Sequence, residues 1–355
     1  MITHSEALQI VLDTAFTTEK ETIPVGESVH RILAEDVFSA ITMPPFNKSM
    51  VDGFAIQKKD IGDELVIEGL IPAGETEDYL LQQGHCMKIM TGAPVPNGAD
   101  MVVMVEDVDV QDNMIRIKNQ RSSVNISPMG EDIREGDLVL PNGTLIKPFH
   151  SGILATIGLD SVHVYKKPSI GIIVTGNEII EPGKKLEKGQ IYNCNGTQLI
   201  SFCRSLDLEA EYYGIVEDTY KATEEAIRFA LEKHDVLIIT GGVSMGELDY
   251  VAPAIKNSGL NVCFDSIAAQ PGRPLVFARN EQKFCFGMPG NPVSGLVLFE
   301  TIVKPMLYRI MGHEFFAPVF PFVLRQTISR KKAVRKSWYP VKLDPEGTVS
   351  PLIYH

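Results

Sequence analysis

The sequence is poor in positive charge and contains neither a long hydrophobic run nor a paired-cysteine motif. Its 33 Lys and Arg residues against 45 Asp and Glu residues give a net charge of −12, which argues against general nucleic-acid or anionic-membrane binding because phosphates would be repelled. The absence of about 18 consecutive apolar residues, and of a basic-then-apolar start, predicts a cytoplasmic protein without a membrane span. Five cysteines with no CxxC pair argue against a disulfide framework or a zinc site.

The composition is that of a globular protein of two or three domains. Its 355 residues are 44% hydrophobic and 22% charged, which is close to the globular average and excludes a mainly disordered chain. Thr3 and Glu6 have the spacing of a capping box, so a helix is expected over residues 4–16. Residues 41–136 contain short β-branched runs separated by turn residues and predict an inserted β-rich domain.

From residue 167 onward, strand and helix patterns alternate. Such alternation predicts an α/β domain with a doubly wound, mostly parallel sheet covered by helices on both faces. The expected strands are 169–175, 209–216 and 236–240, followed by a hairpin at 274–278 and 283–287; the expected helices are 197–205, 222–233 and 293–311. The predicted domains are an N-terminal linker module (1–40 and 137–166), the β-rich domain (41–136), the α/β domain (167–312) and a partial C-terminal β domain (313–355).

Three strand-to-helix turns of the α/β domain carry glycine and polar residues. They are Gly176-Asn177-Glu178, the run that begins Gly241-Gly242, and Gly290-Asn291-Pro292. Ligands of open α/β sheets bind beyond the carboxyl ends of the strands, and glycine turns leave free N–H groups that can cradle phosphate oxygens. Tight packing alone is the alternative reading of each turn. The spacing matches neither a P-loop nor a dinucleotide fingerprint.

Acidic residues accompany these turns. Glu178, Asp218 and Asp249 each lie just past an expected strand end. Carboxylates beside a phosphate cradle would repel the ligand unless a hard cation bridges them, and oxygen ligands with phosphate are the usual Mg²⁺ arrangement. For each acid taken singly, a solvated helix cap is the alternative interpretation.

Five motifs together resemble the molybdopterin molybdenumtransferase (molybdenum insertase) family, which includes the E domain of gephyrin. The resemblance extends over essentially the whole chain and in order. The motifs are residues 45–55 (PFNKSMVDGFA), 89–100 (IMTGAPVPNGAD) with 130–133 (GEDI), 175–178 (TGNE), 240–249 (TGGVSMGELD) and 288–294 (MPGNPVS).

The resemblance implies a specific reaction and site. Family members insert molybdenum from molybdate into adenylylated molybdopterin, with Mg²⁺ and release of AMP, and are elongated homodimers with an active site shared between subunits. Implied catalytic residues are Asp52, Thr91 and Asp132, reaching the partner's cleft, with Glu178, Asp218 and Asp249, the last three also as metal ligands. Implied substrate-binding residues are Thr175, Gly176, Gly241, Gly242, Ser244, Pro271, Gly272, Arg273, Gly290, Asn291, Pro292, Ser294 and Arg335.

The sequence also departs from the family pattern. Gln270 and Ser266 stand where family members commonly have lysines, and Arg273 keeps one charge as a guanidinium. We therefore expect weaker molybdate binding, or binding shifted to backbone N–H groups and Arg335. The family's His-x-Gly-Ser segment would begin at His355, so either the sequence is a truncated version or part of the molybdate pocket is missing.

Two other functions stay open. The pathway's adenylyltransferase shares the α/β domain and its Thr-Gly-Gly-x-Ser turn, although the β-rich insertion favours the insertase; it is also a further expected partner. A non-catalytic, gephyrin-like scaffold is the second alternative. The basic residues at 330–336 are expected to form a solvated turn, and His234 is expected to be a packed or surface residue.

Overall fold

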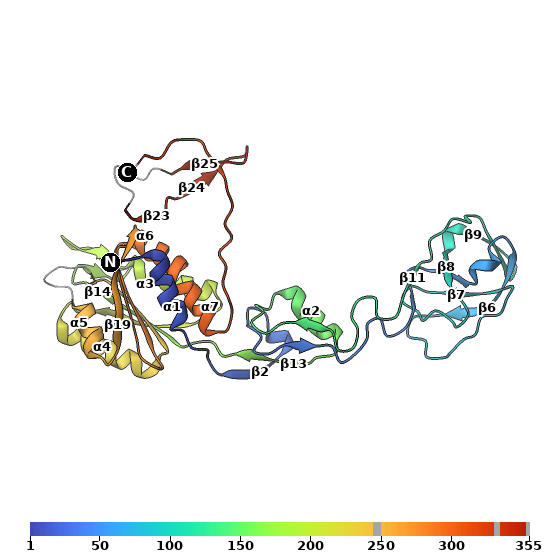
Figure 1. Cartoon of the computed structure of the whole chain (residues 1–355), viewed down its shortest axis with the longest axis horizontal. Helices are drawn as coiled ribbons and strands as arrows, with labels where there is room; N and C mark the ends of the chain where they lie inside the picture. The colour runs from blue at the N-terminus through green and yellow to red at the C-terminus, as the bar shows by residue number, and fades with distance from the viewer. Residues whose placement is uncertain (244–249, 330–333, 353–355) are drawn as a thin grey trace. The chain divides into compact units, whose positions relative to one another are not determined.

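The computed structural model describes residues 1–243, 250–329 and 334–352. The chain divides into two compact units (Figure 1). The α/β unit comprises residues 1–35, 142–151 and 161–355, and the β unit comprises 36–141 and 152–160. The finer domain boundaries given above stay a prediction. In the described ranges no helix combines the length and the apolar character needed to cross a membrane.

The α/β unit is built on one large sheet with the strand order β1-β19-β20-β21-β18-β14-β17, and β23 also pairs with β19. β14, β17, β18 and β21 are parallel, whereas β20 is antiparallel to both of its neighbours. This confirms the predicted mostly parallel sheet with an added hairpin. The bounds are β1 (Ile2–Thr3), β14 (Ile170–Thr175), β17 (Ala210–Val216), β18 (Val236–Thr240), β19 (Asn261–Gln270), β20 (Pro274–Arg279), β21 (Phe284–Met288) and β23 (Lys336–Ser337).

Helices cover both faces of this sheet, because its central strands are apolar on both sides. Ile172 and Ile238 pack into one hydrophobic cluster, while the adjacent Ile173 and Ile239 pack into another. The first cluster includes residues of α1 (His4–Asp13), α3 (Cys194–Ser205), α6 (Pro292–Leu298), η4 (Phe299–Val303) and α7 (Lys304–Ile310); the second includes residues of α4 (Tyr220–Lys233) and α5 (Val251–Asn257).

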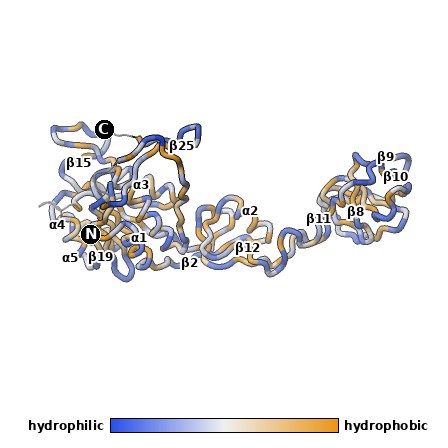
Figure 2. Tube along the Cα trace, turned by 45° about the horizontal axis from the view of Figure 1, so that its top comes forward, coloured by the Kyte–Doolittle hydropathy of each residue, from blue (hydrophilic) through white to orange (hydrophobic). Residues whose placement is uncertain are grey.

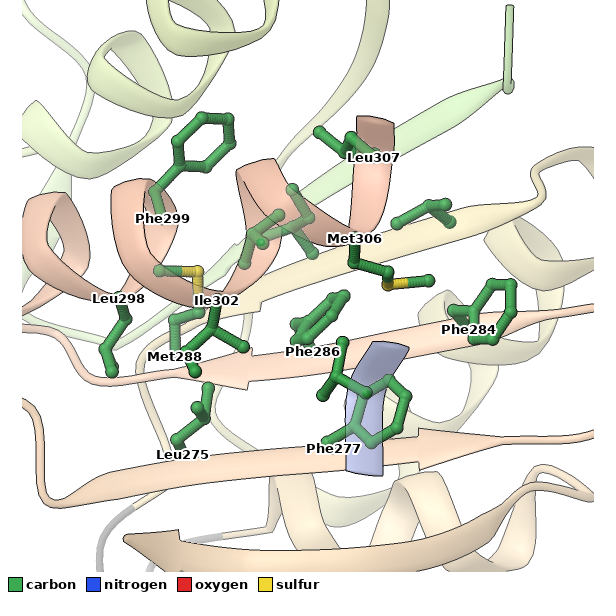
Figure 3. Close-up of a cluster of buried hydrophobic side chains, with 14 of the residues drawn as sticks. Leu275, Phe277, Phe284, Phe286, Met288, Leu298, Phe299, Ile302, Met306 and Leu307 are labelled. Carbon is green, nitrogen blue, oxygen red and sulfur yellow. The ribbon is translucent and has the colours of Figure 1, made fainter. Parts of the chain in front are cut away.

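The predicted helix over 293–311 is continuous but contains one π-helical turn, η4. Pro305 explains it, because proline has no N–H to donate to the carbonyl four residues earlier, at Thr301. The segment still covers the sheet: Figure 3 shows Leu298, Ile302 and Met306 on the helix facing strand side chains such as Phe286.

The N-terminal helix α1 begins with the capping box that the sequence predicts. Thr3 Oγ1 accepts from the Glu6 amide at 3.2 Å, and the Thr3 amide donates to Glu6 Oε2 at 2.7 Å. β1 lies immediately before this helix and pairs with β19, with Ile2 opposite Ile267. The amino end of α1 therefore lies at the edge of the large sheet, beside β19.

Smaller pairings complete the α/β unit. β22 (Val323–Leu324), β24 (Val341–Leu343) and β25 (Thr348–Pro351) form a three-stranded sheet in the C-terminal part of the chain. Two further two-stranded pairs are β2 (Lys20–Pro24) with β13 (Ser161–Tyr165), and β15 (Ile179–Ile180) with β16 (Ile191–Tyr192).

The β unit contains a six-stranded sheet in the order β8-β5-β7-β6-β10-β9. Hydrophobic and hydrophilic residues alternate along β9, which is labelled in the hydropathy-coloured trace of Figure 2. β14 of the other unit is apolar almost throughout. A β-carbon on Gly53 would lie 2.0 Å from the Val103 carbonyl oxygen, so the approach of β5 to β8 requires glycine. The bounds are β3 (Val37–Phe38), β4 (Lys48–Ser49), β5 (Gly53–Ile56), β6 (Glu64–Ile71), β7 (His85–Ile89), β8 (Met101–Met104), β9 (Val108–Gln111), β10 (Met114–Ile117), β11 (Ile126–Ser127) and β12 (Leu138–Leu140); α2 (Pro148–Thr156) crosses the boundary between the units.

Candidate functional site

Three of the glycine-containing turns lie at one edge of the large sheet. In the strand register Val174 is opposite Thr240, and Thr240 is opposite Met288, so β14, β18 and β21 end side by side. The fourth parallel strand ends there too, with Val216 opposite Thr175. The turns that follow these strands therefore share the carboxyl edge, where ligands of open α/β sheets bind.

The turn after β18 requires glycine for two separate reasons. Gly241 has φ +98° and Gly242 φ +58°, a region that favours glycine. In addition, a β-carbon on Gly241 would lie 2.2 Å from the carbonyl oxygen of Thr175. The Gly241 amide donates to the Met288 carbonyl at 3.1 Å, so this turn is tied to both neighbouring strands. The backbone is thus bare at the place where a phosphate could approach it.

Thr175, the last residue of β14, carries a hydroxyl beside these glycines. Its Oγ1 lies 2.8 Å from the β-carbon position of Gly241 and 3.1 Å from that of Gly242. Oγ1 is buried and forms no hydrogen bond within the described ranges. A buried hydroxyl without a partner is unfavourable by about 1–3 kcal/mol, so this group is suited to hydrogen-bond a ligand at the glycine turn.

Asn195 ties two of the turns together and is not among the residues predicted from the sequence. Its Nδ2 donates to Thr240 Oγ1 at 2.8 Å and to the Gly290 carbonyl at 2.9 Å. The Thr240 hydroxyl in turn donates to the Pro289 carbonyl at 3.2 Å. Its one sequence signal is its place two residues after Asn193, the N-cap of α3.

The third turn caps the next helix in the predicted way. Asn291 Oδ1 accepts from the Ser294 amide at 3.0 Å and from the Ser294 hydroxyl at 3.3 Å, and Pro292 occupies the first turn. Because this helix continues through η4 and α7, its amino end presents free N–H groups and a positive dipole end to the carboxyl edge of the sheet.

Two of the three predicted metal ligands lie at this edge. Glu178 is exposed, with Oε2 2.8 Å from the β-carbon position of Gly176. Asp218 is half-buried, with Oδ1 3.6 Å from the β-carbon position of Gly242, and its amide donates to Asn177 Oδ1 at 3.1 Å. Asp249 lies outside the described residues, as does Ser244. In the ranges that the structure covers, no three His, Cys, Asp or Glu side chains form a group that could hold a metal ion.

A second group of predicted residues surrounds the turn between β19 and β20. This turn contains the cis peptide Gln270–Pro271, and Gly272 has φ +103° with its β-carbon position 2.9 Å from Leu298 Cγ. Arg273 is exposed, and Arg335 lies directly before β23, which pairs with β19. β19 is three strands from β18, about 14 Å at the usual strand spacing. The structure therefore places Pro271, Gly272, Arg273 and Arg335 apart from the glycine turn at Gly241.

In the β unit, the structure brings two of the three predicted catalytic residues together. Asp52 Oδ1 accepts from the Thr91 amide at 2.7 Å and from the Thr91 hydroxyl at 2.8 Å. These two hydrogen bonds from Thr91 lower the pKa of the Asp52 carboxyl from its ordinary value. Asp132 is exposed, and its amide donates to the Met43 carbonyl at 3.1 Å. Asp52 is therefore an exposed carboxylate whose position is fixed by Thr91.

Comparison with known proteins identifies the family. Residues 2–158 match the model of the MoeA N-terminal region (domain I and II), and residues 171–309 match that of a probable molybdopterin binding domain. The molybdopterin molybdenumtransferase of Staphylococcus aureus is 35% identical over 331 residues, which are 91% of this chain and 78% of that protein. The Staphylococcus epidermidis protein of the same name is 33% identical over 335 residues, 92% of this chain and 79% of that protein.

The chain belongs to the molybdopterin molybdenumtransferase family. A crystal structure of a molybdopterin biosynthesis MoeA protein from Pyrococcus horikoshii superposes with a TM-score of 0.81 and 31% identity, covering 100% of this chain and 90% of that one. A second crystal structure of a P. horikoshii MoeA protein gives a TM-score of 0.85 and 28% identity over the same shares. The predicted family and fold class are thus confirmed, and the chain is an enzyme of molybdenum cofactor biosynthesis. The roles of single site residues stay predictions.

Proposed function

We propose that this molybdopterin molybdenumtransferase inserts molybdenum from molybdate into adenylylated molybdopterin, with Mg²⁺ and release of AMP. The observation that carries the proposal is the Gly241-Gly242 turn packed against Thr175 at the carboxyl edge of the sheet. It offers bare glycine backbone without a basic side chain, which suits a phosphate ester in a chain of net charge −12.

In this proposal the nucleotide phosphates approach the bare backbone of Gly241 and accept hydrogen bonds from the Gly242 amide and the Thr175 hydroxyl. Asn195 acts as a positioning residue, because its side chain holds the turn after β18 and the turn after β21 in one arrangement. The amino end of α6, capped by Asn291, faces the same edge and favours negative charge.

The donor set fits a hard divalent cation. Glu178 and Asp218 supply carboxylate oxygens beside the glycine turns, and Asp249 is the third proposed ligand. When bound, Mg²⁺ supplies the positive charge that lets an acidic edge hold phosphates and that stabilises AMP as the leaving group. The residues of this chain position the phosphates and hold the two turns in one arrangement by fixed hydrogen bonds.

We further propose that the protein acts as a cytoplasmic homodimer. Asp52, Thr91 and Asp132 lie in the β unit and would complete the site of the partner subunit. What supports this role is that Asp52 is an exposed carboxylate held by two hydrogen bonds from Thr91, rather than part of an ordinary turn. The adenylyltransferase that supplies adenylylated molybdopterin is the proposed partner enzyme.

The test is reconstitution of the full chain with adenylylated molybdopterin, molybdate and Mg²⁺. We expect AMP release and molybdenum cofactor formation, both dependent on Mg²⁺. The Asp52→Asn variant should bind AMP normally but release it more slowly from substrate. If the wild-type chain releases no AMP, the proposal fails; formation of adenylylated molybdopterin from ATP would indicate the adenylyltransferase, and peptide binding without turnover would indicate a scaffold.

A further inference from the structure

The short strand β23 brings a lysine to the turn between β19 and β20. In the register of this pair Lys336 is opposite Ala269 and Ser337 is opposite Gln270. The Trp338 amide donates to the Gln270 carbonyl at 3.0 Å, directly before the cis bond to Pro271. A segment more than 60 residues away in sequence is therefore fixed against this turn.

Aromatic rings hold the side chain of Lys336. Its Nζ lies 5.3 Å from the centre of the Trp338 ring, within the range of a cation–π contact. The Trp338 ring lies 4.7 Å from the ring of His4, the first residue of α1. The lysine is thus held against Trp338, which forms a tilted ring pair with His4, rather than left free in solvent.

His4 is neutral in this ring pair. Its Nε2 donates to Thr301 Oγ1 at 2.9 Å, because the Thr301 hydroxyl is already donating to the Val297 carbonyl at 2.7 Å. Burial, and secondly the charge of Lys336, lowers the pKa of His4 to about 4. The group of Lys336, Trp338 and His4 therefore carries one positive charge at neutral pH, and that charge is on Lys336.

Two cations lie at this turn without an ion pair in the described ranges, Lys336 and Arg273. The Ser337 hydroxyl is buried and makes no hydrogen bond there. In a protein with 45 acidic residues, two cations and a hydroxyl donor left unmatched at one turn indicate a binding place for a small anion.

We propose that Lys336, held on Trp338, is an oxyanion-binding residue of the molybdate pocket. This inference rests on the proposed function. Lys336 lies on β23, which pairs with the end of β19 on one side, and Arg273 lies on the other side, where its carbonyl accepts from the Ile267 amide at 3.0 Å. In this proposal the ammonium and the guanidinium bind the tetrahedral dianion through charge-assisted hydrogen bonds. Lys336 thereby supplies positive charge at a turn where Ser266 and Gln270 stand in place of the lysines common in the family.

The nucleotide phosphate shares this chemistry but has its own place in the fold. The glycine turn after β18 is three strands away from β19, about 14 Å. A single phosphate bound at Gly241 therefore cannot also contact Lys336. The free oxyanion, not the phosphate of AMP, is the ligand assigned to Lys336.

The experiment measures molybdate and AMP binding separately, by calorimetry on the full chain at two salt concentrations. Lys336→Met removes the charge but keeps a chain that can lie on Trp338. We expect it to weaken molybdate binding about tenfold or more, the effect of losing one charged hydrogen bond, and to leave AMP binding within about twofold. The salt dependence of molybdate binding should also become shallower.

Two controls separate the pocket from net charge and from misfolding. Lys342→Met, on the exposed strand β24 of the same C-terminal segment, should bind molybdate like the wild type. Lys336→Arg should recover most of the affinity, and the Lys336 variants should unfold at the wild-type temperature without ligand; Lys336→Gln replaces Lys336→Met if the latter does not fold.

The outcomes also distinguish this inference from the proposed function. Unchanged molybdate affinity in Lys336→Met, with AMP release intact in the wild type, overturns the role of Lys336 alone. An equal loss in Lys342→Met, or an equal loss of AMP binding, also overturns it. A wild-type chain that neither binds molybdate nor releases AMP overturns both.

Discussion

The two edges of the large sheet differ in how their polar groups are matched. The amino edge has a cavity of about 640 Å³ whose charged lining is partly paired: Lys167 Nζ lies 2.7 Å from Asp207 Oδ2, and His234 Nε2 lies 3.3 Å from Glu211 Oε2, while the buried His234 Nδ1 has no hydrogen bond within the described ranges. The carboxyl edge instead presents glycine backbone, the Thr175 hydroxyl and the cations at the cis-Pro271 turn. The size of a hollow is therefore a weaker indicator of a ligand site than unmatched groups.

The physical origin of the difference is the direction of the parallel strands. At the carboxyl edge each strand is followed by a turn that leads into the amino end of a helix, where N–H groups are free. At the amino edge the chain enters each strand from the carboxyl end of a helix. Side chains there hydrogen-bond to one another at the starts of the strands; Asp235, for example, accepts from the Ser169 hydroxyl at 2.7 Å. The carboxyl edge can therefore bind a ligand, whereas the polar groups of the amino edge connect neighbouring strands.

The largest effect is expected from Gly241→Ala. The new β-carbon would lie 2.2 Å from the Thr175 carbonyl oxygen at φ +98°, so the turn must move. We expect a loss of about 3 kcal/mol or more in the free energy of unfolding and loss of AMP release, measured by urea unfolding and by turnover. Gly152→Ala is the control, because no atom lies within 4 Å of its β-carbon position; an equal loss there would contradict the special role of the turn.

A smaller effect is expected from the two buried histidines, one near each edge. The pKa of His4 is lowered to about 4, so protonation favours the unfolded chain and the stabilising contribution of neutral His4 is lost as the pH falls from about 6.5 towards 4. His4→Gln should remove about 2 kcal/mol of this pH dependence of unfolding. Burial also lowers the pKa of His234, but Glu211 opposes that shift, so His234→Gln should change the pH dependence of unfolding less than His4→Gln does. A larger change in His234→Gln than in His4→Gln would contradict the difference between the two edges.

Thr175→Val tests the Thr175 hydroxyl, which has no hydrogen bond within the described ranges. Valine has nearly the same shape without the buried hydroxyl, so we expect unchanged stability or a gain of up to about 1 kcal/mol, together with AMP release slowed about tenfold. Thr240→Val is the matched control, because its hydroxyl accepts from Asn195 and donates to Pro289; this variant should lose about 1–2 kcal/mol of stability. If Thr175→Val instead destabilises the protein and leaves turnover intact, the hydroxyl is structural.

Much of the fold can be predicted from the sequence because its strands are short, apolar and bounded by turn residues. The strand 236–240 is correct to the residue, since a fully buried β-branched run lies between His234-Asp235 and Gly241-Gly242. The capping role of Asn291 follows equally from Pro292 and Ser294 beside it. These features depend on neighbours in sequence.

The features that escape prediction depend on pairing between distant segments. Asn195 becomes important only because α3 begins beside the end of β18. The hydrogen bonds of Thr91 to Asp52, 39 residues away, and the pairing of β23 with β19 likewise follow from the assembled fold. In the order β19-β20-β21-β18, which separates the two groups of predicted binding residues, only the β20–β21 hairpin has a local signal.

The smallest effect is expected at the amino edge, from Lys167→Met. Its pair with Asp207 is partly exposed, with 36% and 47% of the two side chains accessible, and such pairs contribute about 0–1 kcal/mol. Unfolding should shift by about 0.5 kcal/mol or less, and the kcat and KM for AMP release should stay within about twofold of the wild type. Asp207→Asn should behave in the same way, because each variant leaves a partner that water can solvate. A clear rise in KM in either variant would mean that the 640 Å³ cavity takes part in binding, and the contrast between matched and unmatched edges would then be wrong.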